Sequence, residues 1–261
     1  MQTSPAVVTP DAVAAQRESF LKSGYLVFER VVDERQLIDL TGRIRGEFER
    51  VKSSGQLFAG GGTVSGHLNC FPGAASRFVL DQLQAAGIID LVGALSETAL
   101  RAPNIGCNLN LPGSFAQNEH VDGYAAQPFL VVNVACVETN LENGAMEILS
   151  GTHRTESKYW RILLERPERV RLTMRPGDVV IRPSALWHRG MPNHTQHARP
   201  MLAFTWEDGG SQLEDPYAVH QGQITFLPNR YQTDWASRLR ERTFVALPSV
   251  GVAVRAVRSL F

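Results

Sequence analysis

The sequence predicts a mainly β fold with flanking helices, of the sandwich or jelly-roll type. After Pro103, short runs rich in β-branched residues recur and are separated by glycine, proline and asparagine, as in antiparallel sheet proteins. Before Pro103 the apolar residues mostly have helical spacing. The sequence contains neither GxGxxG nor a P-loop, the glycine-rich patterns that mark nucleotide-binding parallel sheets.

Helices are predicted near both ends of the chain. The pattern is helical between Pro10 and Ser53, with Asp11 and Asp33 as the N-caps of two helices. Gly24 to Phe28 is predicted to form a short strand between them. Further helices are expected at residues 77–101 and, rich in arginine, at residues 233–245. The predicted strands of the second half are residues 105–111, 128–138, 170–174, 178–182 and 201–206.

Charge and composition argue against several classes of partner. Lysine plus arginine equals aspartate plus glutamate, 26 against 26, without a block of like charge, so nucleic acids and membrane surfaces are not expected partners. The amino terminus lacks the pattern of a secretory signal, and the apolar runs are too short to span a bilayer. Cys70, Cys107 and Cys136 are odd in number and widely spaced, which does not suggest a disulfide framework. We therefore expect a cytoplasmic protein, whose oligomeric state the sequence does not indicate.

His120 and Asp122 form the first candidate metal-binding motif. On an extended backbone, residues i and i+2 point to the same face, so one cation could bind both. His188 is the third candidate, because it is expected to end the strand that follows the turn at residues 175–178. Two imidazoles and one carboxylate form a facial triad that leaves three positions open on iron(II), enough for a bidentate 2-oxo acid and dioxygen.

Arg199 strengthens this interpretation, because a histidine and an aspartate two residues apart are common by chance. It follows His188 by eleven residues and is expected to begin the next strand. Its planar guanidinium matches a carboxylate and so suits the distal carboxylate of 2-oxoglutarate. We therefore expect His188, the metal ligand, and Arg199, which would bind the co-substrate, to lie on adjacent strands.

Several segments together resemble the phytanoyl-CoA dioxygenase family in their order and spacing. They are Gln117 with His120-Val121-Asp122, the segment NGAMEILSGTH at residues 143–153, the turn at residues 176–178, His188 with Arg199, and FLKSGY at residues 20–25. Each motif is common alone, but jointly they are specific. The resemblance covers roughly residues 15–207.

The resemblance implies a double-stranded β-helix, a cupin-like jelly roll, with iron(II) at its wider mouth and 2-oxoglutarate beside the metal. His120, Asp122 and His188 would be the metal ligands, and Arg199 would pair with the distal carboxylate. Gln117 resembles a glutamine that in some relatives approaches the co-substrate near iron. Asn108 is expected to add a further contact with the co-substrate.

The chain departs from the family pattern beside this site. Many relatives carry a hydroxyl residue two positions after the distal histidine, where this chain has Gly190, so a co-substrate contact must differ or be absent. Asp122 is itself informative, because halogenases of this superfamily have a small residue at the corresponding position. The carboxylate therefore favours hydroxylation over halogenation.

Three residues are candidates for substrate contact: Asn69, Tyr124 and Asn133. Asn69 and His67 follow a glycine-rich loop at residues 60–62, which is interpreted as a flap over the site. Tyr124 directly follows the metal motif and either faces the substrate or packs under a loop. Asn133 is the one polar residue between Phe129 and Val137, so its amide either lines the pocket or is satisfied within the core.

These observations predict an iron(II)- and 2-oxoglutarate-dependent dioxygenase. It would use O2 to hydroxylate or otherwise oxidise a small molecule, expected to be a secondary metabolite, with release of succinate and CO2. Two alternatives remain open: a cupin-like metalloprotein that uses zinc or manganese for non-oxidative chemistry, and a non-catalytic small-molecule binding module. We expect a single oxygenase domain over residues 1–261: a mainly helical support (1–102), a jelly-roll core with the metal site (103–210) and a C-terminal extension (211–261).

Overall fold

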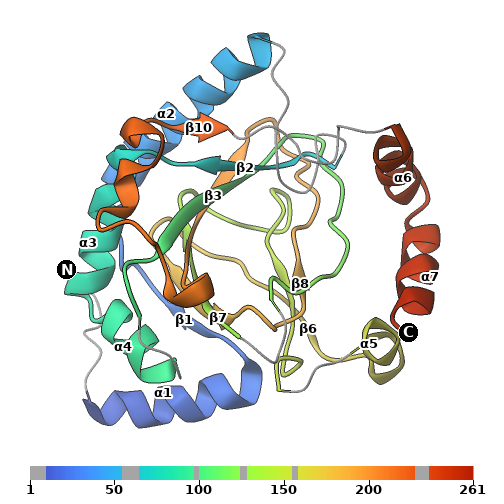
Figure 1. Cartoon of the computed structure of the whole chain (residues 1–261), viewed down its shortest axis with the longest axis horizontal. Coiled ribbons are helices and arrows are strands. Elements are labelled where there is room, and N and C mark those ends of the chain that lie inside the picture. Colours follow the sequence, from blue (N-terminus) through green and yellow to red (C-terminus); the bar gives the residue numbers. More distant parts are fainter. Residues whose placement is uncertain are drawn as a thin grey trace.

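Two antiparallel sheets lie at the centre of the fold, and helices flank them on two sides (Figure 1). This computed structural model describes residues 10–54, 65–96, 100–123, 128–154, 158–226 and 235–260. Within these residues the larger sheet has seven strands in the order β1-β7-β4-β9-β3-β2-β10. The smaller sheet has three strands in the order β6-β5-β8.

The strands of the larger sheet are β1 (Leu26–Phe28), β2 (His67–Phe71), β3 (Asn104–Asn110), β4 (Leu130–Ala135), β7 (Val179–Pro183), β9 (Arg199–Thr205) and β10 (Thr225–Phe226). Those of the smaller sheet are β5 (Glu147–Leu149), β6 (Arg169–Arg171) and β8 (His188–Arg189). The helices are α1 (Pro10–Ser23), α2 (Glu34–Ser53), α3 (Arg77–Ala85), α4 (Ile88–Leu95), α5 (Tyr159–Glu165), α6 (Trp235–Ala246) and α7 (Pro248–Arg258). A short 3-10 helix, η3 (Pro216–Gly222), precedes β10.

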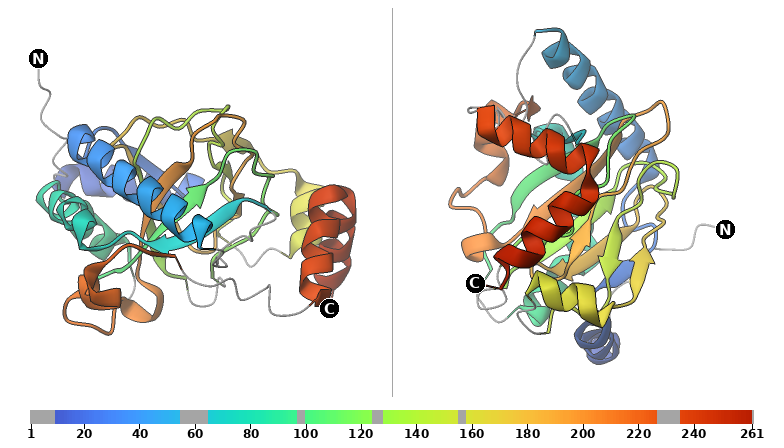
Figure 2. Two further views of the ribbon diagram at one scale, coloured as in Figure 1. Left: turned by 90° about the horizontal axis from the view of Figure 1, so that it is seen from above. Right: turned by 90° about the vertical axis from the view of Figure 1, so that its right-hand side faces the viewer.

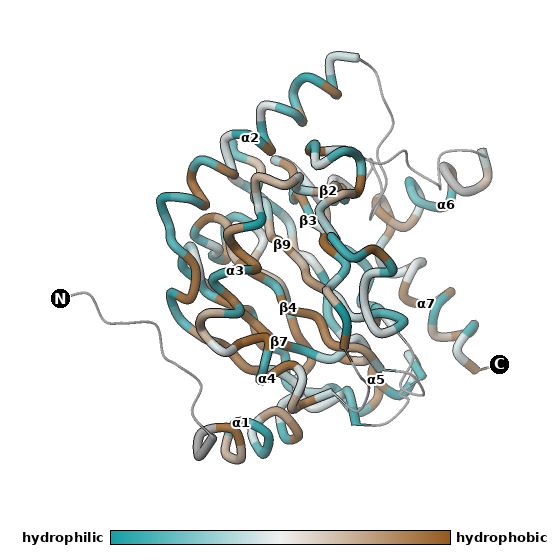
Figure 3. Tube along the Cα trace, turned by 60° about the vertical axis from the view of Figure 1, so that its left-hand side comes forward, coloured by the Kyte–Doolittle hydropathy of each residue, from teal (hydrophilic) through white to brown (hydrophobic). Residues whose placement is uncertain are grey.

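The two faces of the larger sheet differ because side chains alternate along its strands. Leu202 and Phe204 of β9 lie in a hydrophobic cluster with the helices. Met201, one residue away, belongs to a second cluster that includes Ile148 of the smaller sheet. Figure 3 shows the hydrophobic strands β4 and β7 in the interior and hydrophilic residues along α2. The inner face, toward the smaller sheet, is therefore where polar side chains can gather around a cavity.

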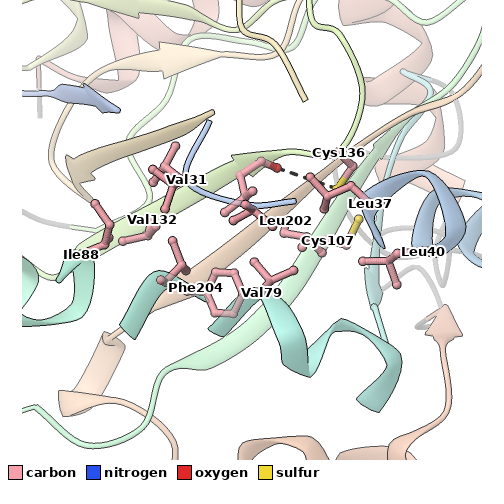
Figure 4. Close-up of a cluster of buried hydrophobic side chains, with 14 of the residues drawn as sticks. Val31, Leu37, Leu40, Val79, Ile88, Cys107, Val132, Cys136, Leu202 and Phe204 are labelled. Atoms are coloured by element: carbon pink, nitrogen blue, oxygen red, sulfur yellow. Dashed lines mark hydrogen bonds between the residues drawn. The ribbon is translucent and has the colours of Figure 1, made fainter. Parts of the chain in front are cut away.

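Helices α1 to α4 lie together on one side of the sheets, opposite α5, α6 and α7 (Figures 1 and 2). Leu37 and Leu40 of α2, Val79 of α3 and Ile88 of α4 are buried against the outer face of the larger sheet. Figure 4 shows Val79 near Phe204, with Leu37 and Leu40 at the other end of the same cluster, near Cys136 and Cys107. The helices thereby support the strands whose inner face carries the candidate site.

The structure modifies two helix predictions. Helix α1 begins at Pro10, so Asp11 lies inside its first turn and is not the residue before it. The helix expected over residues 77–101 is two helices, α3 and α4, because the chain adopts the left-handed conformation at Gly87, with φ of 75°. Asp33 is an N-cap as predicted, since its side chain accepts a hydrogen bond of 3.0 Å from the backbone N–H of Gln36.

Replacing Asp33 by alanine is expected to lower the free energy of unfolding by about 1 kcal/mol, the usual cost of losing a capping oxygen. The measurement is urea denaturation of both proteins. Asp33→Ser keeps an oxygen at this position and should retain most of the stability. Equal losses for the alanine and serine variants would contradict the capping role.

The predicted fold class, mainly β with flanking helices, is confirmed, and β1, β3, β4, β6, β7 and β9 overlap predicted strands. The prediction missed β2, β5, β8 and β10, which are short or interrupted by polar residues, and helices α5 and α7.

In the part of the chain that the structure describes, no single helix is both long and apolar enough to cross a membrane, although the bent pair at residues 74–85 and 88–95 meets those limits jointly.

The expected position of His188 was wrong. It does not end the strand after the Pro-Gly-Asp turn, because that strand, β7, stops at Pro183. The chain then crosses to the smaller sheet, where His188 begins β8. His188 and Arg199 therefore belong to different sheets and not to adjacent strands.

Candidate metal centre

His120, Asp122 and His188 lie close together beside the inner face of the larger sheet. One coordinating atom of each residue lies within 4.8 Å of those of the other two. Nε2 of His120 is 3.8 Å from Oδ1 of Asp122, and Nε2 of His188 is 3.6 Å from Oδ2. The two histidines pair in an isolated β-bridge with backbone hydrogen bonds of 2.9 and 3.0 Å. The backbone thus places three side chains that could hold one metal ion.

Backbone carbonyls determine which nitrogen of each imidazole is available to a metal. Nδ1 of His120 donates to the carbonyl of Asn118 at 2.8 Å, and Nδ1 of His188 donates to that of Leu186 at 3.0 Å. With Nδ1 protonated, Nε2 keeps its lone pair, which is the tautomer that metal ligation requires. Two imidazole nitrogens and one carboxylate are a donor set that fits iron(II).

The electrostatics of the site favour these protonation states. Burial and, to a smaller extent, the charge of the nearby Arg182 lower the pKa of His188 to about 3. Burial alone would raise the pKa of Asp122, but the charges of Arg182 and the two imidazoles hold it well below its usual value. At neutral pH the site therefore presents a carboxylate and an uncharged His188, as a metal cation requires.

Arg182 is a member of the site that the sequence reasoning missed. It lies on the inner face of β7, is 4% exposed, and donates from Nη2 to Oδ2 of Asp122 at 2.6 Å. Its Nε donates to the side-chain oxygen of Asn133 at 3.2 Å. The available signal was an arginine within an apolar strand, because a buried guanidinium needs a charged or polar partner. Arg182 holds one oxygen of Asp122 and so restricts the orientation of the carboxylate.

Replacing Arg182 by glutamine is expected to weaken metal binding by roughly 10- to 100-fold, as for other groups that orient a metal ligand. Arg182→Lys keeps the charge but loses the fork that spans Asp122 and Asn133, so its affinity should be intermediate. Titration with cobalt(II) measures both. Arg43→Gln changes an exposed arginine of α2 and serves as the matched control. Unchanged affinity in Arg182→Gln would contradict this role.

Arg199 is a buried cation that faces the same cavity as His188. It is 3% exposed, and its Nε donates to the carbonyl of Asn143 at 3.2 Å. Among the described residues, its buried Nη1 has no hydrogen-bond partner. Burial lowers the pKa of Arg199 to about 10, so the group stays charged at neutral pH. A buried guanidinium with an unused donor fits a carboxylate ligand.

Gln117 and His67 explain the glycine at position 190. The side-chain oxygen of Gln117 accepts from the backbone N–H of Gly190 at 2.8 Å. A Cβ at Gly190 would lie 2.6 Å from Cε1 of His67 and 2.8 Å from that same oxygen of Gln117. The imidazole of His67 therefore fills the space that a hydroxyl residue at position 190 would need. Gln117 lines the cavity, as expected of a residue beside the co-substrate, but its oxygen is bonded to the backbone.

Burial of His67 predicts a loss of stability in mild acid. Its Nε2 donates to the carbonyl of Phe115, and burial lowers its pKa to about 4. The unfolded chain binds the proton near pH 6.5, so the contribution of neutral His67 is complete above that pH and is lost as pH falls toward 4. Between pH 7 and pH 5 we expect this residue to cost about 2 kcal/mol of unfolding free energy. His67→Gln should show a smaller decrease in urea denaturation at the two pH values; an equal decrease would contradict the assignment.

The asparagines proposed from the sequence all line the cavity. Nδ2 of Asn108 donates to Oδ1 of Asn69 at 3.2 Å, so these two amides adjoin on neighbouring strands. Asn133 lines the cavity, and its side-chain oxygen also accepts a hydrogen bond from Arg182. Both roles considered from the sequence, pocket lining and a satisfied amide, are therefore present. Tyr124 and the glycine-rich loop at residues 60–62 lie outside the described residues.

Helix α6 supplies a wall of the cavity that the sequence did not predict. The cavity has a volume of about 610 Å³ and includes Arg240, Phe244 and Val245 of α6 in its lining. Sequence reasoning identified this segment as helical and arginine-rich but gave it no role. Nothing in the linear pattern indicates that Arg240, which follows Arg199 by 41 residues, returns to the cavity of the metal centre.

Arg255 of α7 ties this helix pair to the segment that carries His120. It donates to the backbone carbonyl of Glu119 and, at 2.8 Å, to the hydroxyl of Tyr159, which in turn donates to the Glu119 carboxylate at 2.8 Å. Arg169 bonds to the other oxygen of that carboxylate at 2.6 Å. Glu119, the residue before His120, is therefore bonded through both its backbone carbonyl and its side-chain carboxylate.

Comparison with known proteins assigns this chain to a family. A model of the phytanoyl-CoA dioxygenase family matches residues 20–201. The dioxygenase lolE1 of Epichloe uncinata is 28% identical over 123 residues, which are 42% of this chain and 48% of that protein. The match thus spans about half the length of that curated relative.

Solved structures share the fold. The non-heme alpha ketoglutarate dependent carbocyclase SnoK from nogalamycin biosynthesis has a TM-score of 0.60 and 17% identity, and the match covers 78% of this chain and 86% of that one. The epimerase SnoN, solved in complex with Fe3+, alpha ketoglutarate and nogalamycin RO, has a TM-score of 0.58 and 19% identity, with 76% and 84% covered. At these identities the likeness establishes a common jelly-roll architecture.

Proposed function

The chain belongs to the phytanoyl-CoA dioxygenase family, and from this premise we propose that it is an iron(II)- and 2-oxoglutarate-dependent dioxygenase acting on a small organic molecule. The observation that carries the proposal is the convergence of His120, Asp122 and His188, with coordinating atoms within 4.8 Å of one another. Arg199 supports it independently, because its unused guanidinium donor faces the same cavity. We further propose that the whole chain acts as a single domain around this centre.

Different residues of the site would bind the metal and the co-substrate. His120, Asp122 and His188 would hold iron(II), and Arg199 would bind the distal carboxylate of 2-oxoglutarate. When bound, iron(II) and 2-oxoglutarate together supply the oxidation of a substrate C–H bond by O2, with release of succinate and CO2. Arg182 keeps Asp122 in place, and the backbone carbonyls of Asn118 and Leu186 keep both imidazoles in the ligating tautomer.

Three observations favour hydroxylation or a related oxidation of a secondary metabolite. Asp122 occupies with a carboxylate the position that a halide would need in a halogenase. The structural neighbours SnoK and SnoN come from nogalamycin biosynthesis, and SnoN was solved with nogalamycin RO together with Fe3+ and alpha ketoglutarate. The curated relative lolE1 is named a dioxygenase.

The test is spectroscopic and chemical. Anaerobic addition of iron(II) and 2-oxoglutarate to the apoprotein should give a weak visible charge-transfer band, and admission of O2 should yield succinate even without substrate. Zinc or manganese bound in place of iron, with neither band nor succinate, would instead support a cupin-like protein with non-oxidative chemistry. Absence of the band, of succinate and of metal binding would support a non-catalytic binding module.

A further inference from the structure

A second cavity adjoins the one at the metal centre. It has a volume of about 360 Å³ and lies at the far end of β3, between that strand and η3. Asn69, Asn108 and Ala203 line both cavities. Because three residues are shared, the two cavities adjoin along the inner face of the larger sheet, and we call the two together the trough; the metal centre lies in the first cavity.

Gly106 leaves free space in the floor of this trough, because it has no side chain. It lies on β3 two residues before Asn108, in register with Ala203 of β9, and therefore shares their face of the sheet. A Cβ added at Gly106 would have no atom within 4 Å. A glycine and an alanine side by side leave unfilled space where two larger side chains would close the passage between the cavities.

The second cavity, at the end of the trough away from the metal, combines apolar surface with a few uncharged polar groups. In the described part of the second cavity, the polar residues are amides, one serine and His220, with no aspartate, glutamate, lysine or arginine. His220 stands over Phe71, with ring centroids 5.9 Å apart, so an aromatic pair lies at this end. A charged group of a ligand would find no counter-charge there, and its desolvation would be uncompensated.

We propose that the substrate is an elongated, electrically neutral molecule with hydrogen-bonding groups along its length. One end lies at the metal centre, its middle crosses Gly106 and Ala203, and its other end occupies the second cavity beside His220. Asn69 and Asn108 donate and accept hydrogen bonds at the midpoint. The inference rests on the proposed function, because it takes the end at the metal as the one that reacts. It predicts that long, uncharged molecules bind in preference to short or anionic metabolites.

The test blocks the trough at Gly106. Protein loaded with nickel(II) and 2-oxoglutarate is incubated with a panel of uncharged polyhydroxylated ring compounds and their glycosides, graded from one ring to several, together with matching carboxylic acids. Bound compounds are identified by affinity selection and mass spectrometry. Gly106→Leu projects a side chain into the passage, and Gly106→Val does so with a residue that favours strands. Gly42→Leu is the matched control, because a Cβ at this exposed α2 glycine also meets nothing within 4 Å.

Wild type and Gly42→Leu should retain long uncharged members of the panel, and the two Gly106 variants should lose these by about tenfold or more relative to short members. Thermal unfolding of each variant confirms that it is folded. Retention of long members by both Gly106 variants, or retention of only short or anionic members by the wild type, would overturn the proposal. The charge-transfer band of the wild type tests the proposed function separately, so long compounds bound without that band would refute the oxygenase and not the trough.

Discussion

Replacing Asp122 by alanine is expected to abolish 2-oxoglutarate turnover and to weaken iron(II) binding by more than about 100-fold, beyond the range usual for residues that only orient a ligand. The variant loses a metal donor and also leaves Arg182 without its carboxylate partner at 2.6 Å. The remaining guanidinium would then repel the cation from a position close to both imidazoles. Cobalt(II) titration measures the affinity, and succinate formation measures turnover.

Two further variants separate charge from shape in this experiment. Asp122→Asn keeps the size of the side chain but not its charge, so metal affinity should still decrease strongly. Asp39→Ala removes an exposed carboxylate of α2 and should behave as wild type. If Asp122→Ala bound cobalt(II) as tightly as the control and still formed succinate, the metal centre would have to lie elsewhere.

Replacing Arg199 by alanine is expected to cost about 2–5 kcal/mol of binding free energy for 2-oxoglutarate, the range found when one partner of a buried charge pair is truncated. The KM for 2-oxoglutarate should then increase by roughly 30-fold or more. The physical reason is that Arg199 is almost fully buried, so no water would compensate the distal carboxylate of the co-substrate. Steady-state succinate formation at varied 2-oxoglutarate measures the change.

Thermal unfolding gives a second measurement of the same role. A ligand that binds only the folded state raises the unfolding temperature, so 2-oxoglutarate should stabilise the metal-loaded wild type much more than Arg199→Ala. Arg199→Lys keeps a charge without the planar fork and should lie between them. Arg35→Ala, at an exposed position of α2, is the control. Equal stabilisation of Arg199→Ala and wild type would assign the carboxylate to another residue.

The sequence was most informative where local chemistry decides the structure. Asp33 could be identified as a cap because its oxygen bonds only three residues ahead. The strands β4 and β7 were evident because both faces are apolar or nearly so. The break at Gly87 was not predicted, because the leucines of α3 and α4 keep a compatible spacing across it.

Long-range relations were less accessible. His120 and Asp122 were recognisable as a pair, but the sheet to which His188 belongs depends on where the chain turns after Pro183. Arg182 was missed because its partner lies 60 residues away. The contribution of α6 to the cavity depends on the route of the chain after the last core strand, which no periodicity encodes.

The attachment of the C-terminal helices has a consequence for how such a protein can diversify. The family match ends at residue 201, whereas the helix that contributes Arg240 and Phe244 lies beyond it. Substitutions on α6 would therefore change one wall of the cavity without replacing any of the three candidate metal ligands. Arg255 limits this freedom, since a change that shifted α7 would be transmitted through Glu119 to its neighbour His120.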